Sequence, residues 1–175
     1  MPDTYLLDTS MLGKFYDDRP DWCVDDPTRR FRAHLERVRD ARFVICAVTI
    51  GEVEYGLESA PPDFPEEKRQ HIRSAVRNFE IVYDISSHTA SPYYAQARAK
   101  LFQKFALKPV RGRRAKARHV EDLLETDGAK PLGIQENDLW IASVAMEYNM
   151  VLVTGDKLSR ITEVCPELRV ENWLL

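Results

Sequence analysis

Residues 4–10 read Thr-Tyr-Leu-Leu-Asp-Thr-Ser, and this stretch decides the fold. The apolar run at 4–7 is too short for an independent helix, which favours a buried β-strand. Asp8 then stands at the carboxyl end of that strand, followed by Thr9 and Ser10. A carboxylate at the edge of a core is costly unless a metal ion or hydrogen-bond donors stabilise it. The stretch therefore predicts a strand that carries an acidic side chain to a functional edge.

Three more short apolar runs, at 43–46, 81–83 and 150–153, resemble the first and predict further strands. Helical spacing of apolar residues lies between them, at 50–57 and again at 90–101. Strands that alternate with helices favour an α/β fold in which helices flank a mainly parallel central sheet.

Length and composition predict one domain over residues 1–175, since 175 residues with 44% hydrophobic content build one substantial core. The net charge of −3 gives no overall basic signal for nucleic acid, so any such signal must be local. Three separated cysteines, Cys23, Cys46 and Cys165, suggest neither a disulfide framework nor a zinc site.

The amino-terminal residues reach Asp8 before any apolar stretch long enough for a signal peptide. No run of about 18 apolar residues follows, so we expect neither export nor membrane insertion. A reducing cytoplasm is the expected location.

Four acidic residues that are far apart in sequence converge on one edge of the expected sheet. Asp8 ends the first strand, and Asp156 follows the strand at 150–153 across a short turn. Glu52 lies near the start of the helix that follows the second strand, and Asp138 lies near the start of the helix that precedes the last apolar run. Ligands of parallel sheets bind beyond the carboxyl ends of the strands. Carboxylates gathered there are the hard oxygen ligands that a divalent metal ion requires.

Each acid also has a purely structural interpretation. Asp138, next to Asn137, could cap a helix, and Asp156 could be a turn residue. Glu52 could be a solvated helix position, although Gly56 one turn further leaves space beside it. Asp8 could be a helix N-cap.

Four blocks of sequence carry a family resemblance. They are Leu-Leu-Asp-Thr-Ser at 6–10, Val-Thr-Ile-Gly-Glu-Val-Glu-Tyr-Gly at 48–56, Asn-Asp-Leu-Trp-Ile-Ala-Ser-Val-Ala at 137–145 and Leu-Val-Thr-Gly-Asp at 152–156. Their order, context and spacing resemble the PIN-domain nucleases, above all the VapC toxins of toxin–antitoxin pairs. The resemblance spans residues 4–175 and includes a closing strand with Trp173.

The resemblance implies an endoribonuclease dependent on Mg²⁺ or Mn²⁺, with an antitoxin protein as partner and a homodimeric assembly. It implies an acidic pocket of Asp8, Glu52, Asp138 and Asp156, in which Asp8 and Asp138 are the foremost metal ligands. Asn137 and Thr154 match positions that support such a pocket by hydrogen bonds. We expect the apolar residues of helices near 50–57 and 72–79 to form the dimer contact.

The chain departs from the family pattern in two places. Ser159 stands where an aromatic residue is common, which leaves the local packing open. A polar, initially basic insertion at about 109–133 makes the chain longer than a typical member and leaves the substrate open.

Positive charge that could attract RNA is concentrated in one stretch, because residues 98–118 contain nine Lys or Arg and no acid. The alternative is a solvated helix face followed by a disordered loop. The candidate RNA-binding residues are Lys104, Lys108, Arg111, Arg113 and Arg114.

Two other functions compete with the nuclease. A phosphatase of the haloacid dehalogenase type would need a second aspartate two positions after Asp8, where Ser10 stands. A catalytically idle module that binds RNA or a partner on the same fold is the stronger alternative.

Overall fold

The computed structural model describes residues 3–106, 119–125, 130–156 and 158–175. The chain forms two compact units, and each is described by itself. The first unit comprises Met1–Asp84, Met150–Asp156 and Val170–Leu175, and the second comprises Ile85–Asn149 and Lys157–Arg169. Within the described residues, no helix is long and apolar enough to cross a membrane.

The first unit is built on a five-stranded sheet with the order β3-β2-β1-β4-β5. The strands are β1 (Thr4–Leu7), β2 (Arg42–Cys46), β3 (Val82–Tyr83), β4 (Val151–Val153) and β5 (Arg169–Glu171). β1 pairs in parallel with both β2 and β4, and β2 pairs in parallel with β3. The four strands expected from apolar runs are therefore confirmed within one residue at their ends, and the chain has the expected α/β fold.

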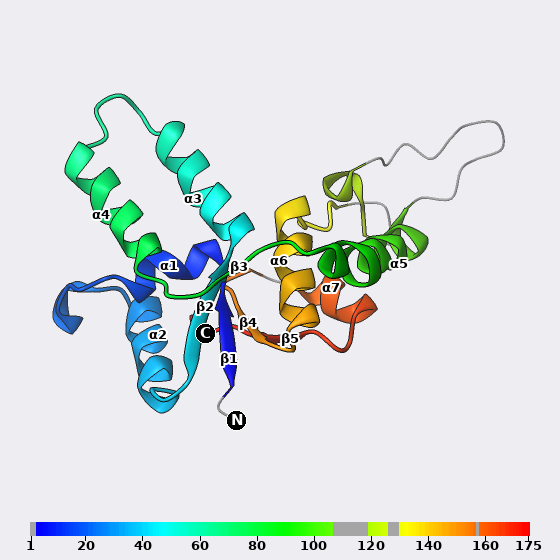
Figure 1. Ribbon diagram of the computed structural model, residues 1–175, viewed down its shortest axis with the longest axis horizontal. Helices are drawn as coiled ribbons and strands as arrows, with labels where there is room; N and C mark the ends of the chain where they lie inside the picture. Colours follow the sequence, from blue (N-terminus) through cyan, green and yellow to red (C-terminus); the bar gives the residue numbers. More distant parts are fainter. Residues whose placement is uncertain (1–2, 107–118, 126–129, 157) are drawn as a thin grey trace. The chain divides into compact units, whose positions relative to one another are not determined.

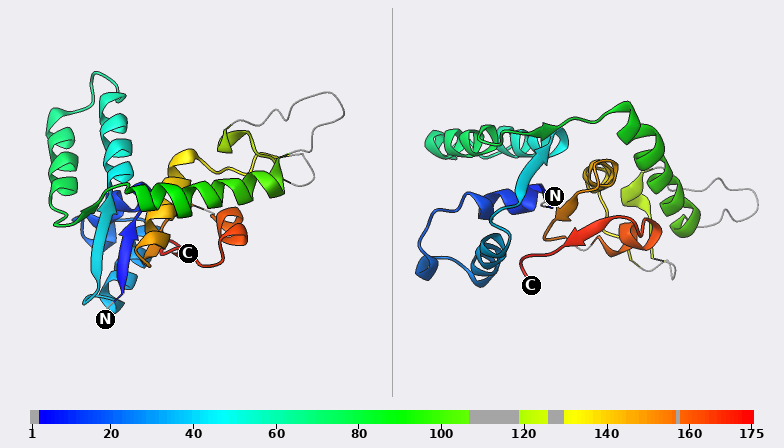
Figure 2. Two further views of the ribbon diagram at one scale, coloured as in Figure 1. Left: turned by 45° about the vertical axis from the view of Figure 1, so that its right-hand side comes forward. Right: turned by 60° about the horizontal axis from the view of Figure 1, so that its bottom comes forward.

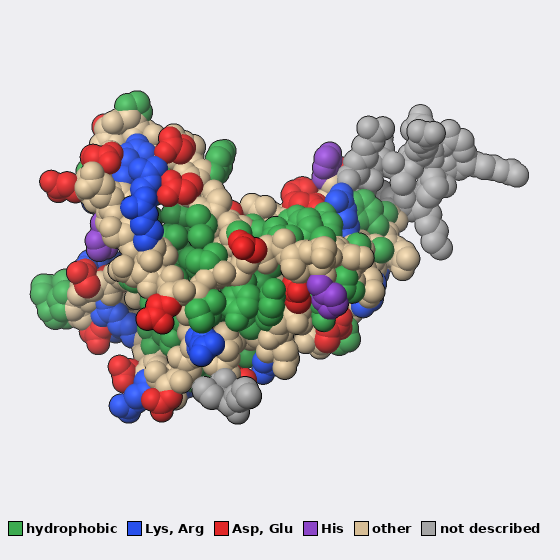
Figure 3. Space-filling model, in the orientation of Figure 1, with side chains coloured by type: hydrophobic (Ala, Val, Ile, Leu, Met, Phe, Trp, Pro, Cys, Tyr) green, Lys and Arg blue, Asp and Glu red, His purple; other side chains and the backbone are tan. Residues whose placement is uncertain are grey.

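Four helices belong to the first unit: α1 (Thr9–Phe15), α2 (Asp26–Arg37), α3 (Ala47–Glu58) and α4 (Glu66–Arg77). A short 3-10 turn, η1 (Asp21–Cys23), lies between α1 and α2. α3 and α4 run side by side as a helical hairpin (Figures 1 and 2). Arg73 of α4 bonds to Glu54 and Glu58 of α3, so basic side chains lie between acidic ones on this hairpin (Figure 3).

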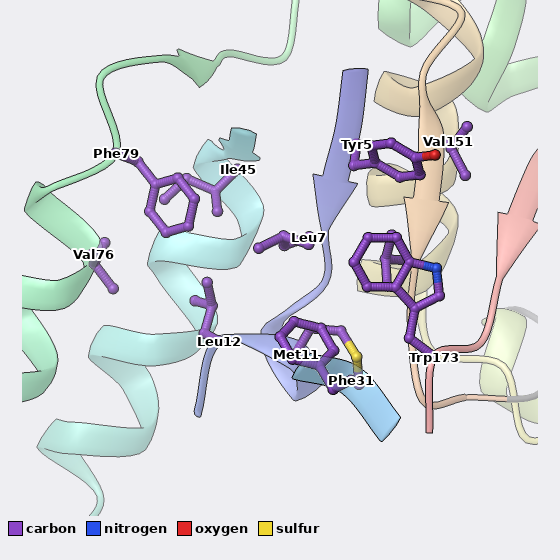
Figure 4. Packing of buried hydrophobic residues seen from close by; sticks show 11 residues of the cluster. Tyr5, Leu7, Met11, Leu12, Phe31, Ile45, Val76, Phe79, Val151 and Trp173 are labelled. Atoms are coloured by element: carbon purple, nitrogen blue, oxygen red, sulfur yellow. The ribbon is translucent and has the colours of Figure 1, made fainter. Parts of the chain in front are cut away.

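Apolar side chains from both strands and helices of the first unit form its core. Leu7 of β1 lies between Ile45 of β2 and Trp173, which is 1% exposed (Figure 4). The Trp173 ring contacts Tyr5 and Phe31 and stacks on His34. These contacts fix the closing segment of the chain against β1. Trp173 lies two residues beyond β5, and not within the closing strand that the resemblance implies.

The second unit is mainly helical. Its elements are η2 (Thr89–Tyr94), α5 (Ala95–Phe105), the 3-10 turn η3 (Val120–Asp122), α6 (Glu136–Glu147) and α7 (Ser159–Val164). α6 packs against η2, and α5 packs against α7. The chain just after residue 119 forms a single 3-10 turn. Cys23, Cys46 and Cys165 are free thiols, as expected from their separation in the sequence.

Candidate active site

Asp8 follows the last residue of β1 and is only 7% exposed. Its Oδ1 accepts a hydrogen bond from the Thr9 N–H (2.7 Å), and its Oδ2 accepts from Ser10 Oγ (2.9 Å) and Thr154 Oγ1 (2.8 Å). Asp8 is the N-cap of α1, so the N-cap interpretation is correct. The cap does not explain the hydrogen bond from Thr154, which lies at the end of β4. Three donors hold this carboxylate in place and leave one of its roughly four acceptor positions for another ligand.

Thr154 and Gly155 join the ends of β4 and β1. Thr154 is 1% exposed, and its Oγ1 accepts the Asp156 N–H at 3.0 Å while donating to Asp8. The Gly155 N–H donates to Ser10 Oγ at 3.2 Å. A Cβ on Gly155 would lie 3.0 Å from Leu174 Cδ1 and 3.2 Å from Met11 Cε, so a larger residue here would require these two side chains to shift slightly.

Asp156 and Glu52 complete a cluster of three acids in the first unit. Partial burial raises the pKa of Asp156, and the negative charges of Asp8 and Glu52 raise it further. Glu52, on the second turn of α3, accepts a hydrogen bond from the Thr9 hydroxyl. Three of the four predicted acids therefore lie near one another, beyond the carboxyl ends of the strands.

Asp138 lies in the second unit, at the third residue of α6. Its Oδ2 accepts the Gln135 N–H at 2.8 Å, as half of a capping box. The capping role considered from sequence is therefore observed, in a helix that begins at Glu136. Asn137 precedes it in the same turn. Because Asp138 and Asn137 are described within the second unit, their convergence with the other three acids stays a prediction.

The chemistry of the cluster suits a hydrated divalent cation. Among the residues that the structure describes, no three His, Cys, Asp or Glu side chains are close enough to hold an ion alone. Mg²⁺ is usually held by one or two carboxylates, with water and substrate phosphate as its other ligands. The open acceptor position of Asp8 and the nearby Asp156 carboxylate fit that requirement.

Thr9 and Ser10 are site residues whose roles the sequence did not reveal. Both hydroxyls donate to cluster acids, Thr9 to Glu52 and Ser10 to Asp8. The signal available was their position directly after a strand-ending aspartate. Hydroxyl donors there orient carboxylates without adding charge.

The basic stretch is only partly described, and its described members have acidic partners. Lys104 Nζ lies 2.6 Å from Glu163, Lys100 lies 3.8 Å from Glu167, and Arg98 lies 3.1 Å from Glu136. The other candidate RNA-binding residues lie outside the described residues: Lys108, Arg111, Arg113 and Arg114. Lys104 is thus neutralised locally rather than presented as an isolated charge.

The sequence and the structure of this chain are both similar to those of known proteins. A family model for the PIN domain matches residues 5–163. The structure of VapBC2 from Rickettsia felis, bound to a promoter DNA fragment, is similar with a TM-score of 0.62 and 24% identity, covering 97% of this chain and 98% of that chain. The structure of VapBC from Salmonella typhimurium, bound to DNA, is similar with a TM-score of 0.61 and 22% identity, covering 97% of this chain and 98% of that chain. The structure of VapBC-1 from nontypeable Haemophilus influenzae has a TM-score of 0.62 and 18% identity, covering 98% of this chain and 99% of that chain.

At these identities the solved structures show a shared fold. The search of curated proteins finds no match to this chain. The family model covers both compact units, including the segments that carry Asp8, Glu52, Asp138 and Asp156. The chain belongs to the PIN domain family.

Proposed function

We propose that this protein is a Mg²⁺- or Mn²⁺-dependent endoribonuclease, the toxin of a toxin–antitoxin pair, folded as a single domain over residues 1–175. The observation that carries the proposal is the cluster of Asp8, Glu52 and Asp156, in which partial burial and then the negative charges of Asp8 and Glu52 raise the pKa of Asp156. Acids that repel one another are retained where a cation binds. Asp138 is proposed as the fourth member, with Asn137 in support.

A divalent ion bound by these carboxylates would polarise the scissile phosphate and activate a water molecule. The protein's own contribution is to hold its carboxylates in place. Three donors fix the Asp8 carboxylate, and Thr154 also fixes the backbone of Asp156. The Thr9 hydroxyl orients Glu52. Such preorganisation places negative charge where the cation is needed before substrate arrives.

The direct test is cleavage of single-stranded RNA with Mg²⁺, with Mn²⁺ and with excess EDTA. We expect cleavage with either ion and none with EDTA. The products should carry 5′-phosphate and 3′-hydroxyl ends, because water attacks and the 2′-hydroxyl takes no part. A 2′,3′-cyclic phosphate, or cleavage that persists in EDTA, would contradict the mechanism. RNA binding without cleavage under every ion would favour the idle module instead.

The antitoxin partner is proposed because the similar solved structures are VapBC structures, one described as a member of a toxin–antitoxin family. An apolar groove of about 500 Å³ in the first unit supports it. α1, α3 and α4 line this groove with Leu12, Val53, Ile72, Ala75 and Val76. An apolar segment of a partner would bury Val53 and Ile72, the two of these side chains that are still partly exposed.

Co-expression with a candidate antitoxin protein tests the groove. Ile72→Glu places a charge among the apolar lining residues and should abolish co-purification. Gln70→Glu adds the same charge at an exposed position of α4 and should not. Equal recovery of both variants with the partner would exclude the groove as the contact.

A homodimer in the cytoplasm is proposed from the same resemblance. Within the segments 50–57 and 72–79 that we expect to form the dimer contact, Leu57, Ala75, Val76 and Phe79 are buried in the first unit. Tyr55 of α3, at 75% exposed, is the large apolar side chain that this hairpin leaves in solvent.

A further inference from the structure

A second cleft of about 350 Å³ lies in the first unit; it shares Tyr16 with the apolar groove and contains none of the clustered acids. Four aromatic rings line it: Phe15, Tyr16, Phe43 and Phe79. They contact one another, with ring centroids 5.5 Å apart for Phe15 and Phe43 and 5.4 Å apart for Phe15 and Phe79. Phe79 is buried, whereas the other three rings are half-buried and offer part of their surface to the cleft.

Polar side chains of three kinds stand at the mouth of this cleft. They are the guanidinium of Arg42, the amide of Asn78 and the carboxylate of Glu80, all exposed. Within the described part of the chain, none of the three side chains forms a hydrogen bond or an ion pair. Some arginines of this unit do have acidic partners, as Arg73 has in Glu54 and Glu58. A cation, an amide and an anion are thus available above an aromatic wall.

The cleft lies toward the amino-terminal ends of the strands. Arg42 is the first residue of β2 and pairs in register with Thr4, the first residue of β1. Asp8 follows the other end of β1, four residues later, which is about 13 Å along a strand. A ligand in the cleft therefore does not occupy the acid cluster.

We propose that this cleft binds one nucleotide of a single-stranded RNA, as an anchoring site separate from the site of cleavage. A base stacks on the half-buried aromatic rings, and such stacking is available to every base. The Arg42 guanidinium binds phosphate by charge-assisted hydrogen bonds. Asn78 donates to and accepts from the base edge, and Glu80 accepts from base N–H or ribose hydroxyl groups. The choice of RNA rests on the proposed function.

Binding is measured without metal, so that affinity is separated from cleavage. The probe is a fluorescein-labelled single-stranded oligoribonucleotide in EDTA, with AMP, GMP, CMP and UMP as competitors. Arg42→Ala and Asn78→Ala should each weaken binding, Arg42→Ala by about tenfold. Both side chains are exposed, so we expect the variants to fold, which thermal unfolding checks.

Lys68→Ala is the matched control. Lys68 is also an exposed cation, on the first turn of α4 and about 15 Å along that helix from Asn78. Its loss should leave affinity nearly unchanged. Cleavage of a dinucleotide, too short to reach both sites, should be equal in Arg42→Ala and the wild type.

The outcomes separate this site from the proposed nuclease. Wild-type RNA affinity in both Arg42→Ala and Asn78→Ala would overturn the anchoring site, whatever the cleavage assay shows. Loss of binding to the antitoxin protein alone would make the cleft a protein contact and would overturn the proposal equally. Weakened RNA binding in a protein that never cleaves RNA would uphold the site and reject the nuclease.

Discussion

Thr154 Oγ1 donates a 2.8 Å hydrogen bond to Asp8 Oδ2 and so joins the ends of two neighbouring parallel strands. The same oxygen accepts the backbone N–H of Asp156 at 3.0 Å. One buried hydroxyl therefore fixes two of the acids on which the proposed chemistry depends.

Replacing Thr154 by valine keeps the shape of the side chain and removes both hydrogen bonds. Because the buried groups lose partners, we expect the free energy of unfolding to fall by about 1–3 kcal/mol. Thr154→Ser retains the hydroxyl and should keep most of the metal response. Urea denaturation and Mn²⁺ titration measure the two effects. Equal stability and equal Mn²⁺ affinity in both variants would show that the hydroxyl does not organise the site.

Asp156→Asn tests repulsion within the cluster when no metal is bound. The folded-state pKa of Asp156 is raised, so its ionised form is disfavoured by folding. As pH rises from the ordinary value of 3.8 through the raised folded value, the wild type should lose stability relative to Asp156→Asn. Below pH 3.8 the Asp156 carboxyl is neutral in the folded and the unfolded wild type, so this difference in stability between the two proteins should disappear.

Unfolding in EDTA across this pH range measures the difference. Added salt should shrink it, because salt screens the repulsion. A pH-dependent difference that added salt does not shrink would mean that burial alone, and not the other acids, raises the pKa of Asp156.

The triple replacement of Arg111, Arg113 and Arg114 by alanine should weaken RNA binding and flatten its dependence on salt. Metal-induced stabilisation should stay as in the wild type. Lys104→Ala removes a cation that already pairs with Glu163, so its effect on binding should be smaller. Fluorescence anisotropy at several salt concentrations gives both values. Unchanged affinity and slope in the triple variant would remove this stretch from the RNA path.

We expect a homodimer in solution, by resemblance to the family and with Tyr55 of α3 exposed. Sedimentation velocity at tens of micromolar should give a dimer of the 20.2 kDa chain. Tyr55→Ser should shift the equilibrium toward monomer if α3 forms the contact. A wild type that sediments only as monomer would reject the assembly.

The strands and three of the acids were predictable because their signals are local. Residues 4–10 contain both the strand and its terminal carboxylate, and β4 with Asp156 repeats that pattern. Partners distant in sequence were not predictable. Lys104 meets Glu163 across 59 positions, and Thr9 meets Glu52 across 43. The burial of Leu57 and Phe79 likewise depends on how helices cover one another, which periodicity alone does not determine.

The central claim is that Asp8 and Asp138 carry charges that a divalent cation needs. Asn at either position keeps the shape of the side chain and removes one of those charges. We expect RNA cleavage to vanish without loss of the fold. In the metal-free variants, loss of the observed cap hydrogen bonds costs about 0.5–2 kcal/mol, and reduced repulsion among the acids offsets part of that cost. A purely structural cap predicts the same cost with metal as without it.

The decisive measurement is the melting temperature of wild type, Asp8→Asn and Asp138→Asn, each with and without Mg²⁺ or Mn²⁺. Metal should raise the melting temperature of the wild type and change either variant much less, by the linkage between binding and stability. Variants that are destabilised, yet still cleave RNA and still respond to metal, would contradict the account.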